Sequence, residues 1–176
     1  MDNIEVPTII TNMPRRGICI YQCHDDNLDN WTPFPENPVI PGVGGSGEGK
    51  ASSKFPECVI FDPSGWKEGD IYYALVGNKN HRPGYEGDST SLFKSKDLRE
   101  WEYVGPFYQS DRKWTEEIED CATSDFFPFG DKHMLVMGGH RPFIKAQYYI
   151  GRYEGNQFYP EMNGQLSRLG SMIGGP

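Results

Sequence analysis

The stretch KSKDLREWEYVGP, residues 94–106, indicates the fold, because an earlier part of the chain repeats its pattern. HDDNLDNWTPFPENP, residues 24–38, also holds a Leu followed three residues later by a Trp. The two pairs, 70 residues apart, are Leu28 with Trp31 and Leu98 with Trp101. Repetition at this distance indicates one supersecondary unit used more than once. We expect each Trp to pack its own unit against the neighbouring one.

A second pair of stretches repeats a turn and a strand. DPSGWKEGDIYYALVGN (residues 62–78) and DFFPFGDKHMLVMGG (residues 125–139) each run from an Asp through a Gly-Asp turn to an apolar segment ending in Gly. The leading residues, Asp62 and Asp125, are 63 positions apart. QYYIGRYEGNQF, residues 147–158, is interpreted as the start of a third unit. The apolar segments are short, β-rich and bounded by Gly or Pro, which predicts an all-β chain.

A four-stranded unit that recurs every 60 to 70 residues is typical of β-propeller blades and not of a β-sandwich. The 176 residues hold between two and three such units, whereas a closed propeller typically needs at least four. We therefore predict an incomplete propeller over residues 1–176, from the end of a first blade to the start of a fourth. The Gly- and Ser-rich stretch 41–54 is predicted to be a loop within it.

The charge of the chain favours a neutral ligand. Its 25 Asp and Glu residues outnumber 17 Lys and Arg residues, for a net charge of −8. This balance argues against a nucleic-acid or membrane partner, because phosphate binding needs clustered cations. A carbohydrate partner is compatible with it. The chain has no run of 18 apolar residues, and its first residues lack the apolar core typical of a signal peptide. Its motifs give no support to a nucleotide, zinc-protease or serine-hydrolase site.

The four cysteines do not form a CxxC pair, so a zinc site has no support. Cys19 and Cys23 are four residues apart and would share one face of a strand. Two such steps span roughly 13 Å, which is too far for a disulfide. We therefore expect free, buried thiols, here and at Cys58 and Cys121.

Three carboxylates, those of Glu119, Asp120 and Asp125, stand directly before an apolar segment in EDCATSDFFPFGDKHMLVMGGH, residues 119–140. The innermost strands of propeller blades converge on one axis, so acidic residues at the starts of such strands meet there. Asp62 has the same placement in the preceding unit. Retaining glycosidases use two carboxyl groups about 5 to 5.5 Å apart. An exposed acidic loop, and a simple turn at Asp62, are the alternative interpretations.

Several segments, taken in order, resemble glycoside hydrolase family 32, the five-bladed β-propeller enzymes that include invertases and levanases. FDPSGWKEGDIYYALVGN (61–78) resembles the strand with the Arg-Asp-Pro motif of that family. LFKSKDLREWEYVGPF (92–107) resembles its segment between the second and third blades. EDCATSDFFPFGDKHML (119–135) resembles its Glu-Cys-Pro-Asp region, YYIGRYEGNQFYPE (148–161) the following strand pair, and GSMIGGP the start of the next blade.

The resemblance implies hydrolysis of β-fructofuranosides, such as sucrose or fructans, by a retaining mechanism without metal or organic cofactor. It makes Asp62 the stabiliser of the transition state. Aligned on the cysteine, the acid/base position falls on Asp120, with Glu119 as the second choice; aligned on Asp125, it falls on Ala122. Asp125 is expected to hold the backbone or a sugar hydroxyl. Further residues expected at the substrate are Phe61 (in place of the Arg of the family), Trp66, Phe126, His140 and Arg141, with structural packing as their alternative role.

The motif of the family that carries its nucleophilic Asp has no match here, and its place would lie before residue 1. The resemblance therefore implies that the 176 residues alone are inactive and that a longer parent protein is the enzyme. Two alternatives stay open. One is an inverting furanosidase of the arabinanase type on the same fold, and the other is a propeller that binds carbohydrate without cleaving it.

Overall fold

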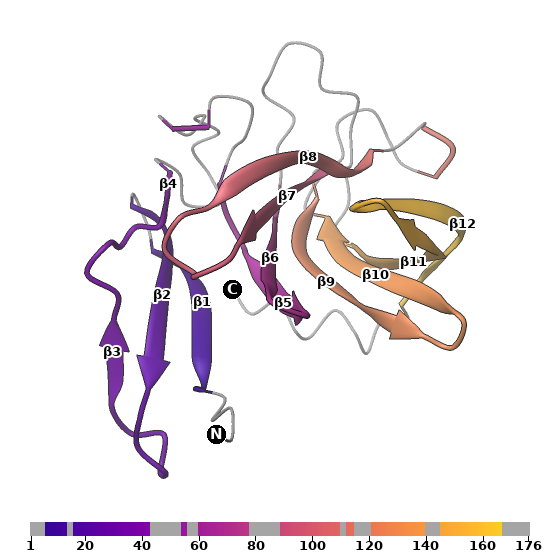
Figure 1. Ribbon diagram of the computed structural model, residues 1–176. Helices are drawn as coiled ribbons and strands as arrows, with labels where there is room; N and C mark the ends of the chain where they lie inside the picture. The colour runs from indigo at the N-terminus through magenta and orange to yellow at the C-terminus, as the bar shows by residue number, and fades with distance from the viewer. Residues whose placement is uncertain are drawn as a thin grey trace.

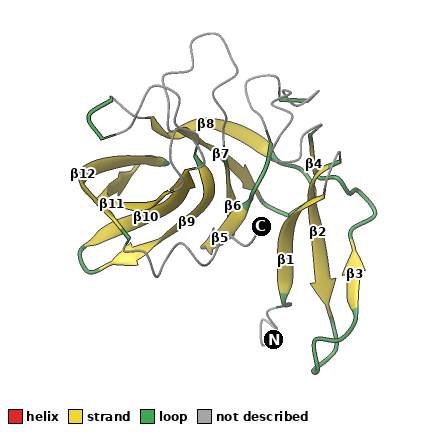
Figure 2. Cartoon of the chain, turned by 180° about the vertical axis from the view of Figure 1, so that it is seen from behind, coloured by secondary structure: helices red, strands yellow, loops and turns green. Residues whose placement is uncertain are grey.

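The computed structural model describes residues 6–13, 16–42, 54–55, 60–77, 89–109, 112–114, 121–139 and 145–166. Every regular element in these ranges is a β-strand, and the strands form three antiparallel sheets (Figures 1 and 2). The predicted all-β fold, a partial propeller, is confirmed. Within these ranges no helix is long and apolar enough to cross a membrane. The predicted loop at 41–54 falls almost wholly outside the described residues, as does the expected start of a fourth blade.

The first sheet contains β1 (Thr8–Met13), β2 (Gly17–Cys23), β3 (Trp31–Pro33) and β4 (Ile40–Pro41). Its order is β1-β2-β3, and β4 also pairs with β2. β3 pairs with the last residues of β2, and β4 pairs with its first two residues. Strands β3 and β4 therefore act as one outer strand that is interrupted between them.

The second and third sheets each place four strands side by side in chain order. The second contains β5 (Ser64–Glu68), β6 (Ile71–Val76), β7 (Ser89–Ser95) and β8 (Glu102–Gln109). The third contains β9 (Ala122–Phe129), β10 (Lys132–Gly139), β11 (Lys145–Glu154) and β12 (Gln157–Gln165). The predicted Gly-Asp turns join β5 to β6 and β9 to β10. Gly69 and Gly130 have φ values of 56° and 64°, which glycine adopts without a Cβ clash in a two-residue hairpin.

Both faces of the second sheet carry buried residues. Alternate side chains of a strand point to opposite faces of its sheet, so neighbouring residues join different apolar clusters. Ala74 and Val76 of β6 join the apolar cluster shared with the first sheet. Leu75, between them, joins the cluster shared with the third sheet. Leu92 and Phe93 of β7 divide in the same way. Two blade-to-blade interfaces therefore hold the three sheets together.

The two Leu-x-x-Trp stretches form the same turn, which bears out the repeat. Leu28 and Leu98 have positive φ values of 60° and 65°. The indole Nε1–H of Trp31 and that of Trp101 each donate to the carbonyl of the Leu three residues earlier, at 2.9 Å. Trp101 is 4% exposed and packs between the first two blades. The expected packing role of this Trp is therefore confirmed.

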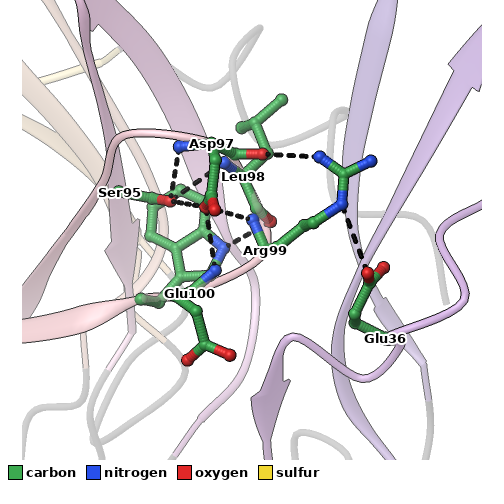
Figure 3. A network of polar contacts seen from close by, with 7 residues as sticks. Glu36, Ser95, Asp97, Leu98, Arg99 and Glu100 are labelled. Carbon is green, nitrogen blue, oxygen red and sulfur yellow. Dashed lines mark hydrogen bonds and ion pairs between the residues drawn. The ribbon is translucent and has the colours of Figure 1, made fainter.

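The backbone N–H groups of the first turn donate hydrogen bonds to a different set of side chains from those of the second turn. In the first turn a single carboxylate, that of Asp25, accepts from three backbone N–H groups, at 2.9 to 3.1 Å. In the second turn two side chains accept these hydrogen bonds. Ser95 Oγ accepts from two backbone N–H groups, and Asp97 Oδ1 accepts from the next two (Figure 3). Arg99 then pairs with Glu36 at 3.2 Å, which joins this turn to the first blade.

Because of these hydrogen bonds, we expect the folded protein to lose stability in acid. Bonds from Cys23 and from the backbone lower the pKa of Asp25, and backbone bonds lower the pKa of Asp97. A depressed pKa in the folded state stabilises the protein above the unfolded-state value, about 3.9, and the contribution disappears as the pH falls through the folded value. We expect urea denaturation to show a steep fall in unfolding free energy below about pH 4. The fall in unfolding free energy will be shallower in a D25N/D97N variant. It will be unchanged in the control variant D26N, which alters the neighbouring carboxylate.

The described cysteines, Cys19, Cys23 and Cys121, are buried thiols that form no disulfide, as predicted. Cys58 lies outside the described residues. Burial raises the pKa of the Cys19 thiol, which keeps it protonated and unreactive at neutral pH. The thiols therefore contribute to packing.

Candidate active site

The innermost strands of the second and third blades begin with the same backbone irregularity. Asp62 and Thr123 both have a φ of 45°, a left-handed conformation that is uncommon for Asp and rare for a β-branched residue. At Thr123 the register between β9 and β10 shifts by one residue, a β-bulge. Bulges of this kind redirect side chains and are frequent beside active sites. The strain therefore marks the starts of β5 and β9 as candidate site positions.

The structure corrects the alignment of the two repeats. The turn residues Gly69 and Gly130, and the strained residues Asp62 and Thr123, are 61 positions apart. The sequence comparison had matched Asp62 with Asp125, at 63 positions. Asp125 instead corresponds to Ser64, one strand period further along. Asp62 and Ser64 of one blade, and Thr123 and Asp125 of the next, all border one hollow, so both blades present a carboxylate and a hydroxyl there, in opposite order.

These side chains surround one hollow of about 360 Å³. The hollow lies where β1, β5 and β9 come together, and Asp62 and Asp125 both border it. Asp62 is half-buried and Asp125 is exposed. The full lining is Ile10, Thr11, Asn12, Asp62, Pro63, Ser64, Thr123, Ser124 and Asp125. The composition is mostly polar, which suits a ligand rich in hydroxyl groups.

Phe61 is fully buried and supports the turn that carries Asp62. Its carbonyl accepts a hydrogen bond from the N–H of Gly77 at 3.0 Å. A Cβ at Gly77 would lie within 3 Å of both the Phe61 ring and the Cys121 carbonyl, so glycine permits this close approach. The ring thus fixes the start of β5 against the start of β9. A contact between Phe61 and a sugar stays a prediction.

The two other aromatic candidates lie among packed rings. Trp66 stacks on Tyr73 and contacts the Phe126 ring at 5.4 Å. Phe126 also stacks on His133 at 5.0 Å and belongs to the interface between the second and third blades. Trp66 borders a separate hollow of about 500 Å³ between the first two blades. The structure gives both rings a packing role, and their contact with substrate stays a prediction.

Four candidates, Glu119, Asp120, His140 and Arg141, lie outside the described residues. The described residue next to Asp120 is Cys121, which is 0% exposed. Its Sγ lies 3.2 Å from Ser124 Oγ and 3.5 Å from Met137 Sδ. This contact fixes the chain at the start of β9, one residue from the expected acid/base. The acid/base assignment itself stays a prediction.

Asn12 is a site residue that the sequence did not reveal. Asn12 borders the hollow, and its buried Oδ1 has no hydrogen-bond donor among the described residues. Thr11, Ser64 and Thr123 were missed as well. A single polar residue near the end of an apolar strand gives no signal of its own. Among the described residues, no group of three or more His, Cys, Asp or Glu side chains is arranged to hold a metal.

The fold is a partial β-propeller, and carboxylates from two successive blades border one hollow. Among family models, the glycosyl hydrolases family 32 N-terminal domain matches residues 9–171. The chain belongs to glycosyl hydrolase family 32.

Two curated relatives agree with this assignment. A sucrose-6-phosphate hydrolase of Zymomonas mobilis subsp. mobilis is 26% identical over 125 residues, covering 62% of this chain and 24% of that protein. The enzyme of the same name from Salmonella typhimurium is 24% identical over 97 residues, covering 53% of this chain and 20% of that protein. The chain thus spans a quarter or less of these relatives.

Among solved structures, fructan 1-exohydrolase IIa from Cichorium intybus superposes with a TM-score of 0.62 at 18% identity, covering 89% of this chain and 30% of that chain. The GH32 beta-fructofuranosidase of Bombyx mori gives a TM-score of 0.58 at 18% identity, covering 93% and 33%. At such low identity these structures support the fold alone.

Proposed function

We propose that the protein containing this chain hydrolyses β-fructofuranosides, such as sucrose or a fructan, by a retaining two-carboxylate mechanism. The observation that carries the proposal is the shared hollow, in which Asp62 and Asp125 from successive blades line one polar cavity. The relatives support the substrate class, since both curated matches are named sucrose-6-phosphate hydrolases. One matched structure, a variant of the Bombyx mori enzyme, is in complex with sucrose.

In this proposal Asp62 hydrogen-bonds sugar hydroxyls, and the bonds strengthen as positive charge develops on the ring in the oxocarbenium-like transition state. Asp120, or Glu119 as the second choice, donates the proton to the leaving oxygen. Asp125 and Ser64 hold further hydroxyl groups of the sugar. The group that attacks the anomeric carbon comes from outside the described residues, and residues 1–176 alone are expected to be inactive.

The test is sucrose and fructan hydrolysis by the protein at its full natural length. D62N will lower kcat about 10²- to 10³-fold, the usual effect of removing one transition-state hydrogen bond, and will change KM much less. D70N is the matched control, because Asp70 is an exposed carboxylate in the turn at the other end of β5. It will retain activity. Equal activity of D62N and the unaltered enzyme would refute the role of Asp62.

A binding propeller without catalysis is the second candidate, and one observation favours it. Phe61 stands where the family has an Arg, and its buried ring offers the hollow no charge or hydrogen bond. Titration of the full-length protein with sucrose separates the two functions. Heat released on binding with no fructose formed over hours would support the binding protein, whereas release of fructose supports the hydrolase.

A further inference from the structure

A second hollow, of about 500 Å³, lies between the first and second blades. Residues near the starts of β1 and β6, near the ends of β2 and β5, and in the turn after β7 border it. Neighbouring strands are antiparallel, so these strand ends meet at one end of the two blades. Asp62 precedes β5 and therefore lies at the opposite end. The second hollow is thus distinct from the candidate active site.

Four polar side chains line the second hollow from two facing sheets. Ile20 belongs to the apolar cluster between the first two blades, so Gln22, two residues further along β2, lies on the same face. Thr8 pairs with Gln22 across the sheet and shares that face. On the second blade, Tyr72 packs against the same cluster, and Lys67 is its cross-strand partner. All four residues border the hollow.

The floor of the second hollow is apolar. Ile20, Leu98 and Trp101 border the hollow and are buried in the cluster between the blades. Gly65 keeps the space above them open, because a Cβ there would lie only 3.4 Å from Ile10 Cγ2. The second hollow therefore combines an apolar floor with a polar rim, the composition that small-molecule sites typically have.

The rim has hydrogen-bonding groups available to a ligand. Gln22 Nε2 donates to Thr8 Oγ1 at 3.3 Å, and Gln22 Oε1 has no further partner among the described residues. The Lys67 ammonium lies 5.3 Å from the centre of the Tyr72 ring. Of the described residues, no carboxylate borders the hollow, which disfavours a cationic ligand. A single ammonium is less than the group of donors with which proteins bind phosphate, so the lining favours a neutral, hydroxylated ligand.

We propose that the second hollow binds a neutral carbohydrate, one or two sugar rings of a longer chain. The C–H face of a ring packs on the apolar floor, and the hydroxyl groups bind Gln22, Lys67 and Thr8 at the rim. Ile10 borders both hollows, so they are neighbours. A fructan held in the second hollow would be kept at a high effective concentration beside the candidate active site. This last role rests on the proposed function, whereas the binding itself does not.

The test is binding of an inulin-type fructan oligosaccharide to the D62N variant of the protein at its full natural length, followed by NMR of isoleucine methyl groups. Ile20 borders the second hollow but not the candidate active site, and Ile150, in the third blade, borders neither. We expect the Ile20 methyl signal to shift in a saturable manner as the oligosaccharide is added. The Ile150 signal will stay in place.

A double substitution at the rim locates the site. Adding Q22A/K67A to D62N will weaken the binding reported by the Ile20 methyl about five- to tenfold, because hydrogen bonds to the sugar are lost. Q165A/K96A is the matched control, since Gln165 and Lys96 are exposed and border neither hollow. The control will bind like D62N alone. With Asp62 intact, Q22A/K67A will raise KM for long fructans about fivefold and leave kcat, and KM for sucrose, unchanged.

Three results would overturn the inference. In the first, the Ile20 methyl does not shift even at a large molar excess of the oligosaccharide. In the second, Q22A/K67A binds as tightly as its control. In the third, inorganic phosphate shifts the Ile20 methyl and the oligosaccharide does not, which would make the hollow an anion site. A protein that shows the Ile20 shift and yet hydrolyses neither sucrose nor fructan would retain this site and refute the proposed function alone.

Discussion

Replacing Trp101 with Ala will lower the free energy of unfolding by about 3–5 kcal/mol. The indole is 4% exposed and packs in the cluster between the first two blades, and its Nε1–H donates to the Leu98 carbonyl. The substitution leaves a cavity at a blade interface and a carbonyl without its donor. Urea denaturation will show the loss as a lower midpoint at an unchanged slope.

The repeat supplies the matched control for this prediction. Trp31 makes the same hydrogen bond, to Leu28 at 2.9 Å, but Trp31 is only half-buried and Leu28 is 48% exposed. W31A removes the same atoms from the same turn with less burial, so its cost will be smaller than that of W101A. Equal losses in the two variants would show that the local turn, and not the blade interface, sets the energy.

Replacing Phe107 with Ala is the second change with a large expected effect, again about 3–5 kcal/mol. Phe107 is fully buried in β8. Its ring contacts four other rings, at centroid distances of 4.8 to 6.1 Å: Trp66, Phe126, Tyr153 and Phe158. The substitution removes the centre of the cluster between the second and third blades. Phe126 lies next to Asp125 in β9, so the hollow is expected to lose order with the interface.

Thermal and urea unfolding of F107A are compared with those of F129A. Phe129 is 49% exposed at the end of β9, and an exposed ring away from the core changes stability by no more than about 0.5 kcal/mol. F107L restores part of the buried area and will fall between F107A and the unaltered chain. If F129A is as destabilised as F107A, the interface assigned to Phe107 is wrong.

The features that the sequence predicted correctly depend on contacts within short segments of the chain. The Leu-x-x-Trp turn closes on itself, because the indole donates to a carbonyl three residues away. The Gly-Asp turns depend on the φ of a single glycine at each hairpin. The alternation of β6 between two apolar clusters follows from a period of two. For these reasons the strands, their repetition and the propeller class were predictable from the residues alone.

From the amino-acid sequence alone, the all-β repeat and the packing of Trp101 between blades were predicted, and both are confirmed. Of the expected meeting of acidic residues, the structure shows that Asp62 and Asp125 border one hollow. The structure was needed to align the two repeats: Thr123, not Asp125, occupies the place of Asp62, since both residues have a φ of 45° at the same distance before a Gly-Asp turn. It also decided that Asn12 borders the hollow and that Phe61 lies beneath it. The hollow brings together residues 10–12, 62–64 and 123–125, which are far apart in the chain, so no local pattern encodes it.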